Sequence, residues 1–297
     1  MKNSYSSKIF GRVFYLLLIC FTIFAVLDVF YISRSYGDAA GDTGDSAVLD
    51  VKNATITDSS FDDGNVSITL STERVKGTNI HIADVVLSSP EYLKTAFAKN
   101  KYGKNIIDTT SDMADEHSAM LAVNGDYYGV QNDGYVVRNG TLYRSTAADG
   151  DRDDMAVLSD GTMEIVSESK FSAQELVDNG AVQVFSFGPA LIDDGLISVG
   201  ENDEVDLAKT SNPRTAIGMI APLHYIFLVS DGRTDESEGF TLYELACFMR
   251  SCGVVCAYNL DGGGSSTMVF NGNVVNSPTS DGVVFRERNV SDIVYIG

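Results

Sequence analysis

The sequence predicts an α+β fold in which a largely antiparallel or mixed sheet carries a few packed helices, preceded by an N-terminal transmembrane helix. Most of the chain consists of short apolar runs, rich in β-branched and aromatic residues and separated by turn residues, as strands are. Hairpin-type connections outnumber helices long enough to cross between parallel strands. A long apolar run stands near the N-terminus. These observations favour a domain with antiparallel strands that follows an N-terminal membrane anchor in the sequence.

The apolar run covers residues 13–32 and is interrupted only by Thr22 and Asp28. About 20 helical residues span a bilayer core. Basic residues precede the run, at Lys2, Lys8 and Arg12. By the positive-inside rule we expect a cytoplasmic segment 1–12, an uncleaved signal-anchor at 13–33, and a single-pass protein of the cell membrane whose remaining chain is extracytoplasmic. A cleaved signal peptide is the alternative.

Behind this run, residues 34–46 are rich in Gly and Asp and contain little to bury. We therefore expect a stalk or linker at 34–64 and one folded domain at 65–297. The formal net charge of −20 excludes the basic surface that nucleic acid requires, so we expect no nucleic-acid partner. On so acidic a chain, a site for an anionic substrate must gather its few arginines locally.

Strands are predicted by apolar alternation between turn residues. Two hairpins have two-residue turns, Asn139-Gly140 and Asp160-Gly161. The predicted strands are residues 66–70, 79–87, 120–123, 135–137, 155–158, 181–187, 190–198, 214–220, 224–230, 254–258, 267–270, 273–276 and 293–296.

Three helices are predicted from their caps. Ser89-Pro90 opens residues 91–100, with proline at the first helical position. Ser172 and Glu175 form a capping box for residues 173–178. Residues 241–251 place apolar side chains on one face and end before a glycine.

Four cysteines are present, and Cys20 lies in the apolar run. The other three, Cys247, Cys252 and Cys256, have no histidine near them, which argues against a zinc site. We expect buried thiols, and a single disulfide is the alternative.

Polar, Gly-containing turns follow several strands, and the most informative one is Asn259-Leu260-Asp261-Gly262-Gly263-Gly264. Three consecutive glycines are expected where the chain turns with positive φ or where a group approaches the backbone closely. Comparable turns occur at 124–129, 212–218 and 230–233, and a fifth polar segment, 286–289, precedes the last strand. Three of the five segments carry arginine, which suggests that they converge on an anion.

Five segments taken together, NGDYYG, NPRTAIG, LVSDGR, TLYELACFMRSCGVVCAYNLDGGGSST and RNVSDIVYIG, resemble the phosphodiester glycosidase family in that order, over about residues 65–297. Bacterial members of this family are often labelled exopolysaccharide-related. The chain departs from the family pattern at two places. It has Asp126-Tyr127-Tyr128 where the family usually has Gly-Phe-Phe, which we expect to put a carboxylate and two hydroxyls at the mouth of the site. It also has Ser291-Asp292 where the family favours small apolar residues.

The resemblance implies hydrolysis of a sugar-1-phosphodiester at the sugar C1–O bond, and we expect an extracytoplasmic reaction on cell-surface polysaccharide or a teichoic-acid-like polymer. Phosphate oxygens suit planar guanidinium groups, and an oxocarbenium-like sugar suits carboxylates. The expected catalytic residues are Asp261, Asp231 and Asp126. The expected phosphate ligands are Arg214, Arg233 and Arg288, together with Gly262, Gly263, Gly264, Ser265 and Thr267. Asn124 and Asn259 are expected to bind sugar hydroxyls, and Tyr127 or Tyr128 to stack on the ring.

Two other functions stay open on sequence grounds. The same residues could belong to a noncatalytic protein that binds or assembles surface polysaccharide. They could also belong to a metal-dependent phosphodiesterase, since Asp126, Asp231 and Asp261 could hold Ca²⁺ or Mg²⁺. No cofactor is required by the sequence, and a divalent cation is possible.

Overall fold

The computed structural model describes residues 2–40, 47–150, 152–204 and 211–297, with side chains from residue 12 onward. Its helices are α1 (Lys2–Phe30), α2 (Thr110–Glu116), α3 (Ala173–Asp178) and α4 (Leu242–Ser251), and its single 3-10 turns are η1 (Pro90–Tyr92), η2 (Ala98–Asn100) and η3 (Gly263–Ser265). The strands are β1 (Arg34–Asp38), β2 (Thr55–Ile56), β3 (Ser60–Asp62), β4 (Val66–Val75), β5 (Thr78–Leu87), β6 (Leu93–Phe97), β7 (Lys101–Lys104), β8 (Leu121–Asn124), β9 (Val136–Arg138), β10 (Thr141–Arg144), β11 (Asp153–Leu158), β12 (Met163–Ser167), β13 (Ala181–Phe185), β14 (Ala190–Asp193), β15 (Leu196–Ile197), β16 (Arg214–Ala221), β17 (His224–Ser230), β18 (Cys256–Asn259), β19 (Met268–Phe270), β20 (Asn273–Val274) and β21 (Asp292–Ile296).

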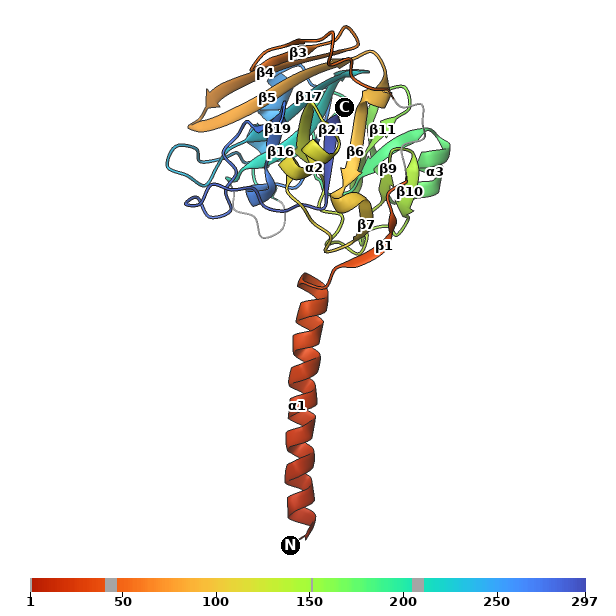
Figure 1. Cartoon of the computed structure of the whole chain (residues 1–297), viewed down its shortest axis with the longest axis vertical. Helices are drawn as coiled ribbons and strands as arrows, with labels where there is room; N and C mark the ends of the chain where they lie inside the picture. Colours follow the sequence, from red (N-terminus) through yellow and green to blue (C-terminus); the bar gives the residue numbers. More distant parts are fainter. Residues whose placement is uncertain (1, 41–46, 151, 205–210) are drawn as a thin grey trace.

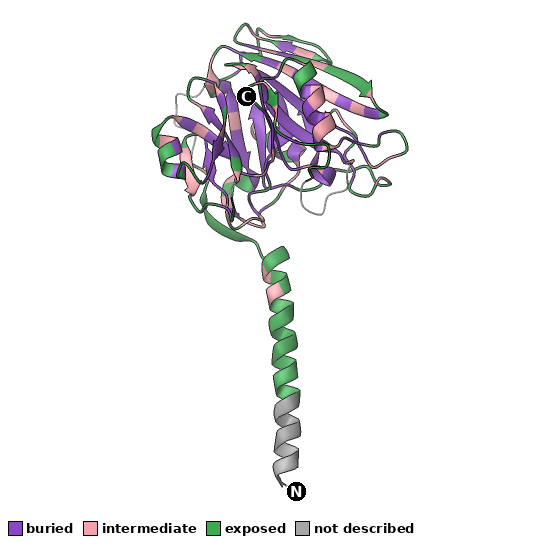
Figure 2. Cartoon of the chain, turned by 180° about the vertical axis from the view of Figure 1, so that it is seen from behind, coloured by how far each residue is buried: buried purple, intermediate pink, exposed green. Residues whose placement is uncertain are grey.

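Helix α1 projects from the domain as one continuous helix (Figure 1). Its segment Arg12–Phe30 is long and apolar enough to cross a membrane, and none of it is buried against the domain (Figure 2). A signal sequence has the same length and composition. The C-terminal end of α1 is held to the domain by Asn105, whose Nδ2 donates to the carbonyls of Val29 and Ile32 at 3.1 Å. Strand β1 then pairs directly with β7.

The domain contains three larger sheets in which every described strand pair is antiparallel, as the hairpin turns predicted. A nine-stranded sheet has the order β15-β14-β18-β16-β17-β5-β4-β3-β2, and two five-stranded sheets have the orders β10-β9-β13-β11-β12 and β20-β19-β8-β21-β6. The hairpins at Asn139-Gly140 and Asp160-Gly161 are confirmed, because β10 pairs with β9 and β12 pairs with β11.

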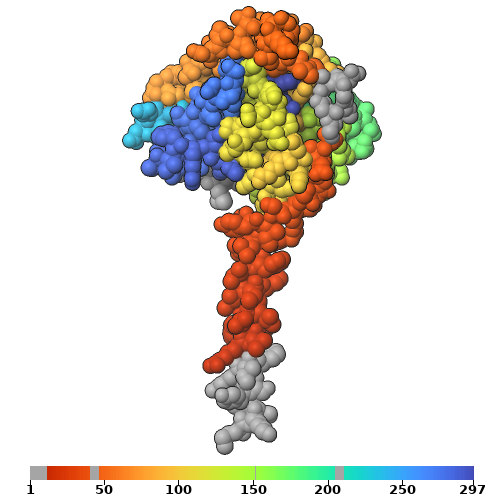
Figure 3. All heavy atoms as spheres, viewed as in Figure 1, coloured from red at the N-terminus to blue at the C-terminus, as the bar shows by residue number. Residues whose placement is uncertain are grey.

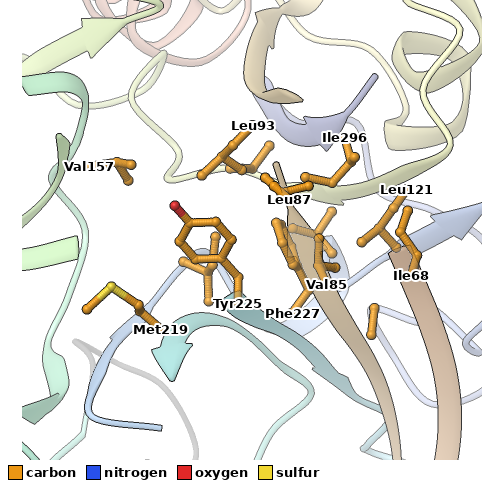
Figure 4. Packing of buried hydrophobic residues seen from close by; sticks show 14 of the residues in the cluster. Ile68, Val85, Leu87, Leu93, Leu121, Val157, Met219, Tyr225, Phe227 and Ile296 are labelled. Carbon is orange, nitrogen blue, oxygen red and sulfur yellow. The ribbon is translucent and has the colours of Figure 1, made fainter. Parts of the chain in front are cut away.

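The main core lies between one face of the nine-stranded sheet and the two five-stranded sheets. Phe227 of β17 is fully buried there with Leu121 of β8 and Met155 of β11, so all three sheets contribute to one apolar cluster. Figure 4 shows Phe227 and Leu121 among the buried side chains of this cluster, together with Val157 of β11. At roughly 25 cal/mol per Å² of buried apolar surface, this interface is the main driving force for folding.

The helices cover the outer faces. Helix α4 packs Leu242, Leu245 and Met249 on the opposite face of the nine-stranded sheet, while α2 and α3 each cover one five-stranded sheet. The predicted capping box at Ser172 and Glu175 of α3 is present, and α4 begins with a capping box at Thr241. Helix α2 was not predicted, because it has only 7 residues and its cap, Thr109, precedes a polar stretch.

The predicted helix at residues 91–100 is wrong. Ser89 and Pro90 do begin a helical turn, η1, but it ends after one turn and residues 93–97 form β6. Leu93, Thr95 and Phe97 all pair with β21, so alternation and sheet pairing outweigh the helix-start signal. The single strand predicted at 190–198 is a hairpin, β14 and β15, with Asp194 and Gly195 both at positive φ.

Segment 34–64, expected to be a stalk, contributes strands to the domain where it is described. Besides β1, it contains β2 and β3, which form the edge of the nine-stranded sheet. This segment joins the domain because it has apolar side chains to bury: Phe61 of β3 is fully buried and Leu49 is 9% exposed. Residues 41–46 lie outside the described residues. Cys20, Cys247, Cys252 and Cys256 are all free thiols.

Candidate active site

The polar turns singled out in the sequence meet where two sheets approach each other. The nine-stranded sheet contributes the start of β16 and the ends of β17 and β18, which are neighbours because Arg214 pairs with Ser230 and Ala216 with Asn259. The sheet containing β8 contributes the end of β8 and the start of β21, where Ile293 pairs with Asn124. Loops far apart in the chain are thereby brought to one edge; Asn124 and Asp261, for example, are 137 residues apart and are hydrogen-bonded.

Asn124 joins the two sheets from beneath. Its Nδ2 donates to the carbonyl of Asp261 at 2.6 Å, and its Oδ1 accepts from the Thr215 hydroxyl at 2.8 Å and from the Thr267 amide at 3.2 Å. The Asp261 amide in turn donates to the carbonyl of Gly125 at 3.1 Å. Asn124 is 0% exposed, so its amide is committed to the protein and is not presented to a sugar as we expected.

Asp261 is the carboxylate at the centre of this edge and is 8% exposed. Its Oδ2 accepts from the Ser265 hydroxyl at 2.6 Å and from Nη2 of Arg288 at 3.0 Å. Burial raises the pKa of Asp261, and the charge of Arg288 and the bond from Ser265 partly offset this rise. Asp261 is therefore a desolvated carboxylate beside one cation, with a pKa above its ordinary value.

The three glycines that follow Asp261 are explained by close approach. A Cβ at Gly262 would lie 3.0 Å from the carbonyl oxygen of Pro213, and one at Gly264 would lie 2.2 Å from the Ser280 hydroxyl. Gly263 has φ +61, and a Cβ there would lie 2.8 Å from Nη2 of Arg233. The loop continues into η3. Arg233 lies directly against its backbone at Gly263, where only glycine leaves room for the guanidinium group.

Arg288 is positioned by its neighbours in sequence. Glu287 accepts a hydrogen bond from the Ser111 amide at 3.0 Å, and Val290 and Asp108 exchange backbone hydrogen bonds at 2.7 and 3.0 Å. The C-terminal segment is thus fixed beside α2, and both lie on the face shown in Figure 3. Arg288 keeps 44% of its side chain exposed while bonding Asp261 and Ser265, so it remains accessible to an anion.

The three expected arginines lie near one another. Arg233 donates to Oδ1 of Asn212 and to the carbonyl of Ser280. Its pKa is lowered by burial and then by the charge of Arg288. Arg214 is 3% exposed and donates to Glu204 at 2.9 Å. Its pKa is lowered by burial and by the charge of Arg233, against the raising effect of Glu204.

The three arginines border one glycine loop, since Arg214 lies against Gly262, Arg233 lies against Gly263, and Arg288 bonds Asp261 directly before them. They are not equivalent, however. Arg233 lies against Gly263 and Arg288 keeps 44% of its side chain exposed, whereas Arg214 is 3% exposed and its Nη2 donates to Glu204. Arg288 is therefore the most accessible of the three.

Asp231 lies in the same group of loops, but both of its carboxylate oxygens already accept hydrogen bonds. It is 4% exposed and accepts from Nε2 of His81 at 3.2 Å and from the Ser277 amide at 2.8 Å. Burial alone would raise the pKa of Asp231, but the bonds from His81, Ser277 and Asn276 outweigh it, so the pKa is lowered. Asn276 also donates to the carbonyl of Ser266 at 2.9 Å, so Asp231 fixes the loop after Gly264.

Asp126 does not lie at the mouth of the site, and that expectation is wrong. It is 0% exposed, and its Oδ1 lies 2.8 Å from Nη2 of Arg138. Arg138 bonds Asp292 as well, at 2.9 Å. The two departures from the family pattern noted above therefore meet at one buried guanidinium. Tyr128 is also buried, at 1% exposed, and packs on Tyr102.

Of the two tyrosines, only Tyr127 reaches the site. It is 36% exposed, and the pKa of its hydroxyl is raised by burial and by the charge of Asp261 and lowered by Arg288. Asn259 is 1% exposed and donates to the carbonyl of Gly188. Its Oδ1 and the Thr267 hydroxyl are buried polar atoms without a hydrogen-bond partner.

A resident metal finds little support in the side chains. Among the residues that the structure describes, no group of three or more His, Cys, Asp or Glu side chains is arranged to hold a metal ion. Asp126 and Asp261 each face an arginine instead.

Sequence reasoning missed Arg138 and His81, which determine what Asp126 and Asp231 can do. One signal was available for Arg138. A charged residue at the end of a strand that is otherwise Val-Val predicts a buried partner of opposite charge.

Comparison with known proteins agrees with this fold. A family model described as phosphodiester glycosidase matches residues 117–297. The chain is 29% identical over 199 residues to an uncharacterized SPbeta prophage-derived protein, YomE, of Bacillus subtilis, covering 66% of this chain and 30% of that protein. It is 30% identical over 208 residues to mouse N-acetylglucosamine-1-phosphodiester alpha-N-acetylglucosaminidase, covering 63% of this chain and 39% of that protein. The chain thus spans about a third of the length of these relatives.

Among solved structures, the pro-peptide-inhibited catalytic domain of the zebrafish N-acetylglucosamine-1-phosphodiester alpha-N-acetylglucosaminidase superposes with a TM-score of 0.62 at 19% identity, covering 89% of this chain and 87% of that one. A hypothetical protein from Synechocystis superposes with a TM-score of 0.53 at 14% identity, covering 78% of this chain and 62% of that one. These likenesses show a shared fold.

Proposed function

Because this chain belongs to the phosphodiester glycosidase family, we propose that its domain hydrolyses a sugar-1-phosphodiester at the bond between the sugar C1 and its oxygen. One observation carries this proposal. A buried carboxylate, Asp261, lies on a glycine loop that is bordered by the guanidinium groups of Arg233 and Arg288. That combination suits a substrate with a phosphate on one side of the scissile bond and an incipient cation on the other.

The roles follow from position. Arg233 and Arg288 bind the phosphate oxygens and stabilise the charge that grows on the phosphate as the C1–O bond breaks. Arg214 adds positive potential from its buried position beside the same loop, where its Nη2 already bonds Glu204. The electron pair of the broken bond goes to the phosphate, which leaves as a monoester. A water molecule supplies the oxygen that ends on C1 and releases its proton.

Asp261 stabilises the oxocarbenium-like sugar and orients the attacking water. The side-chain bonds from Ser265 and Arg288 to this carboxylate both end on Oδ2, and the Gly262 amide also stabilises its charged form. Burial raises the pKa of Asp261, so the group combines partial basicity with negative charge in a desolvated place. Asp231 holds the neighbouring loop and orients it through Asn276.

The proposal also includes a location for the domain in the cell. If α1 spans the membrane, with Lys2, Lys8 and Arg12 on the cytoplasmic side, the domain acts outside the cytoplasm on surface polysaccharide or a teichoic-acid-like polymer. Protease treatment of intact cells tests this: we expect the domain to be degraded while a cytoplasmic control protein survives. Protection of the domain would contradict the orientation.

The reaction is tested with N-acetylglucosamine-1-phosphodiester model compounds and UDP-N-acetylglucosamine in ¹⁸O-labelled water. We expect a free reducing sugar that carries ¹⁸O at C1, and loss of turnover in Asp261→Asn with the fold retained. Label in the phosphate, with the sugar phosphate as product, means P–O cleavage and refutes the glycosidase. Tight binding of the compound without turnover favours a binding protein instead.

A further inference from the structure

A buried ionic triad of Asp126, Arg138 and Asp292 lies beneath the site. Nη2 of Arg138 is 2.8 Å from Oδ1 of Asp126 and 2.9 Å from Oδ2 of Asp292. The three residues are 0%, 2% and 0% exposed, so substrate cannot touch them. The guanidinium is further confined by the ring of Phe185, whose centroid lies 4.3 Å from its Cζ. A triad of this kind contributes nothing to chemistry directly, and removing one member leaves an unpaired buried charge.

The triad is bonded to the loop that carries Tyr127. Oδ1 of Asp126 accepts from the Tyr128 amide at 3.2 Å, which closes a turn around Tyr127, and its Oδ2 accepts from the Ser186 amide at 3.0 Å. The Gly125 amide donates to the carbonyl of Asp292 at 2.9 Å. Gly125 also has no room for a side chain, since a Cβ would lie 2.3 Å from Oδ1 of Asp292. The loop is therefore clamped to the triad on both sides of Tyr127.

Within this loop the backbone of Tyr127 adopts a conformation that is unfavourable for a residue with a side chain. Its φ is +67, in the left-handed region, which costs a residue with a side chain about 1 kcal/mol or more. The same loop is tied to Asp261, whose amide donates to the carbonyl of Gly125 at 3.1 Å, and Tyr127 stays 36% exposed while the next ring, Tyr128, goes to the core. The hydrogen bond that Asp126 accepts from the Tyr128 amide constrains this conformation.

We propose that Asp126, Arg138 and Asp292 are positioning residues that hold Tyr127 beside the Asp261–Arg288 pair, where its ring forms a wall of the sugar subsite. An aromatic ring next to a carboxylate and a guanidinium suits the apolar face of a pyranose whose C1 substituent is a phosphate. The subsite half of this inference rests on the proposed function, whereas the positioning half concerns the folded chain alone. In this proposal Asp126 is a positioning residue that acts through Tyr127, and it is not a catalytic residue.

The substitution Asp126→Asn is the sharpest perturbation. If Asn keeps its oxygen on the Tyr128 amide and Arg138, which both bond Oδ1 of Asp126, its Nδ2 faces the Ser186 amide. If the amide group is turned the other way, Nδ2 faces the Tyr128 amide and Arg138, so a donor opposes a donor in either orientation. The matched control is Asp154→Asn, a second fully buried Asp that lies near Ser186 and Asp126 but makes no hydrogen bond to the loop that carries Tyr127. Asp292→Asn is the milder variant to use if Asp126→Asn does not fold, since it leaves the Asp126–Arg138 pair in place.

The position of residue 127 can be read without any turnover, because the chain contains no tryptophan. In the full-length chain in detergent, Tyr127→Trp gives a single tryptophan that can be excited selectively at the red edge, beyond tyrosine absorption, and acrylamide quenching measures how well it is shielded from solvent. We expect the triad substitution to raise the quenching constant about twofold or more as the ring is released to solvent, and the Asp154→Asn control to leave it unchanged. Unchanged quenching in a folded triad variant refutes the positioning role.

Turnover then tests the subsite role. We expect Asp126→Asn to raise KM about tenfold with a smaller change in kcat, and to have no further effect on KM once Tyr127 is replaced by alanine. An equal loss in both backgrounds would mean that the triad acts on the site by another route, and would overturn the inference. If the chain does not hydrolyse sugar phosphodiesters at all, the quenching result still decides whether the triad positions Tyr127.

Discussion

Replacing Arg288 by methionine should move the acid limb of the pH–activity profile upward. Methionine keeps most of the length of the side chain but removes its charge from Oδ2 of Asp261, 3.0 Å away. Burial already raises the pKa of Asp261, and Arg288 is the largest influence that lowers it. Without that cation the carboxylate is harder to ionise, so its pKa rises further and activity is lost at a higher pH than in the unchanged protein.

The magnitude follows from the geometry. Two unit charges 3.0 Å apart interact by about 5 kcal/mol at an effective dielectric constant of about 20. Arg288 keeps 44% of its side chain exposed against 11% for Asp261, so solvent screens much of this interaction. If about 1–2 kcal/mol survives, the pKa of Asp261 rises by about one unit, at 1.4 kcal/mol per unit.

The assay is the pH dependence of kcat/KM, which reports the free enzyme. The height of the plateau also falls, because Arg288 binds phosphate in our proposal, but only the position of the limb tests the electrostatic reasoning. Arg286→Met is the matched control, since Arg286 is an exposed arginine of the same segment and should leave the limb in place. An acid limb that does not move in Arg288→Met would refute the assignment of that limb to Asp261.

Three further predictions concern stability and the glycine loop. Burial raises the pKa of Asp154 to about 9 from its ordinary 3.8, so the folded chain keeps a proton that the unfolded chain releases. Stability should therefore fall by up to about 1.4 kcal/mol per unit as pH rises through that window, and Asp154→Asn should flatten this fall in urea titrations at pH 5 and 8. An unchanged slope would contradict it. Gly263→Ala should cost at least tenfold in kcat/KM by displacing Arg233 (about 1.4 kcal/mol), whereas Gly272→Ala, also at positive φ but with open space around it, should cost stability alone. Leu245→Ala on α4 should lower the free energy of unfolding by about 3 kcal/mol, because the side chain is fully buried; a loss below 1 kcal/mol would argue against that packing.

The elements that the sequence predicted well are those whose signals are local. Helix α4 and the Asn139-Gly140 hairpin are specified by residues within one element, and both occur where expected. The segment 91–100 shows the limit of that reasoning. Its cap is genuine but lasts one turn, and only pairing with β21, about 200 residues later, makes residues 93–97 a strand.

The residues of the candidate site likewise fall into those that local sequence predicts and those that depend on distant partners. The Asp261 loop and its arginines could be found, because three glycines beside a carboxylate are unusual in themselves. The burial of Asp126 could not, because it depends on Arg138 in another hairpin and on Asp292 near the C-terminal end. An aspartate in a polar turn looks the same in sequence whether it faces solvent or a buried guanidinium.

The direct passage from α1 into β1 has a mechanical consequence. Because β1 pairs with β7 and Ser33 donates to the carbonyl of Asn105 at 2.7 Å, there is no slack between the helix and the domain. If α1 is anchored in a membrane, as we propose, the anchor also sets the height and tilt of the candidate site, and the protein would act only on substrate within that fixed reach. Lengthening the chain between Ile32 and Arg34 should widen the layer of substrate that can be processed while leaving the chemistry of each cut unchanged.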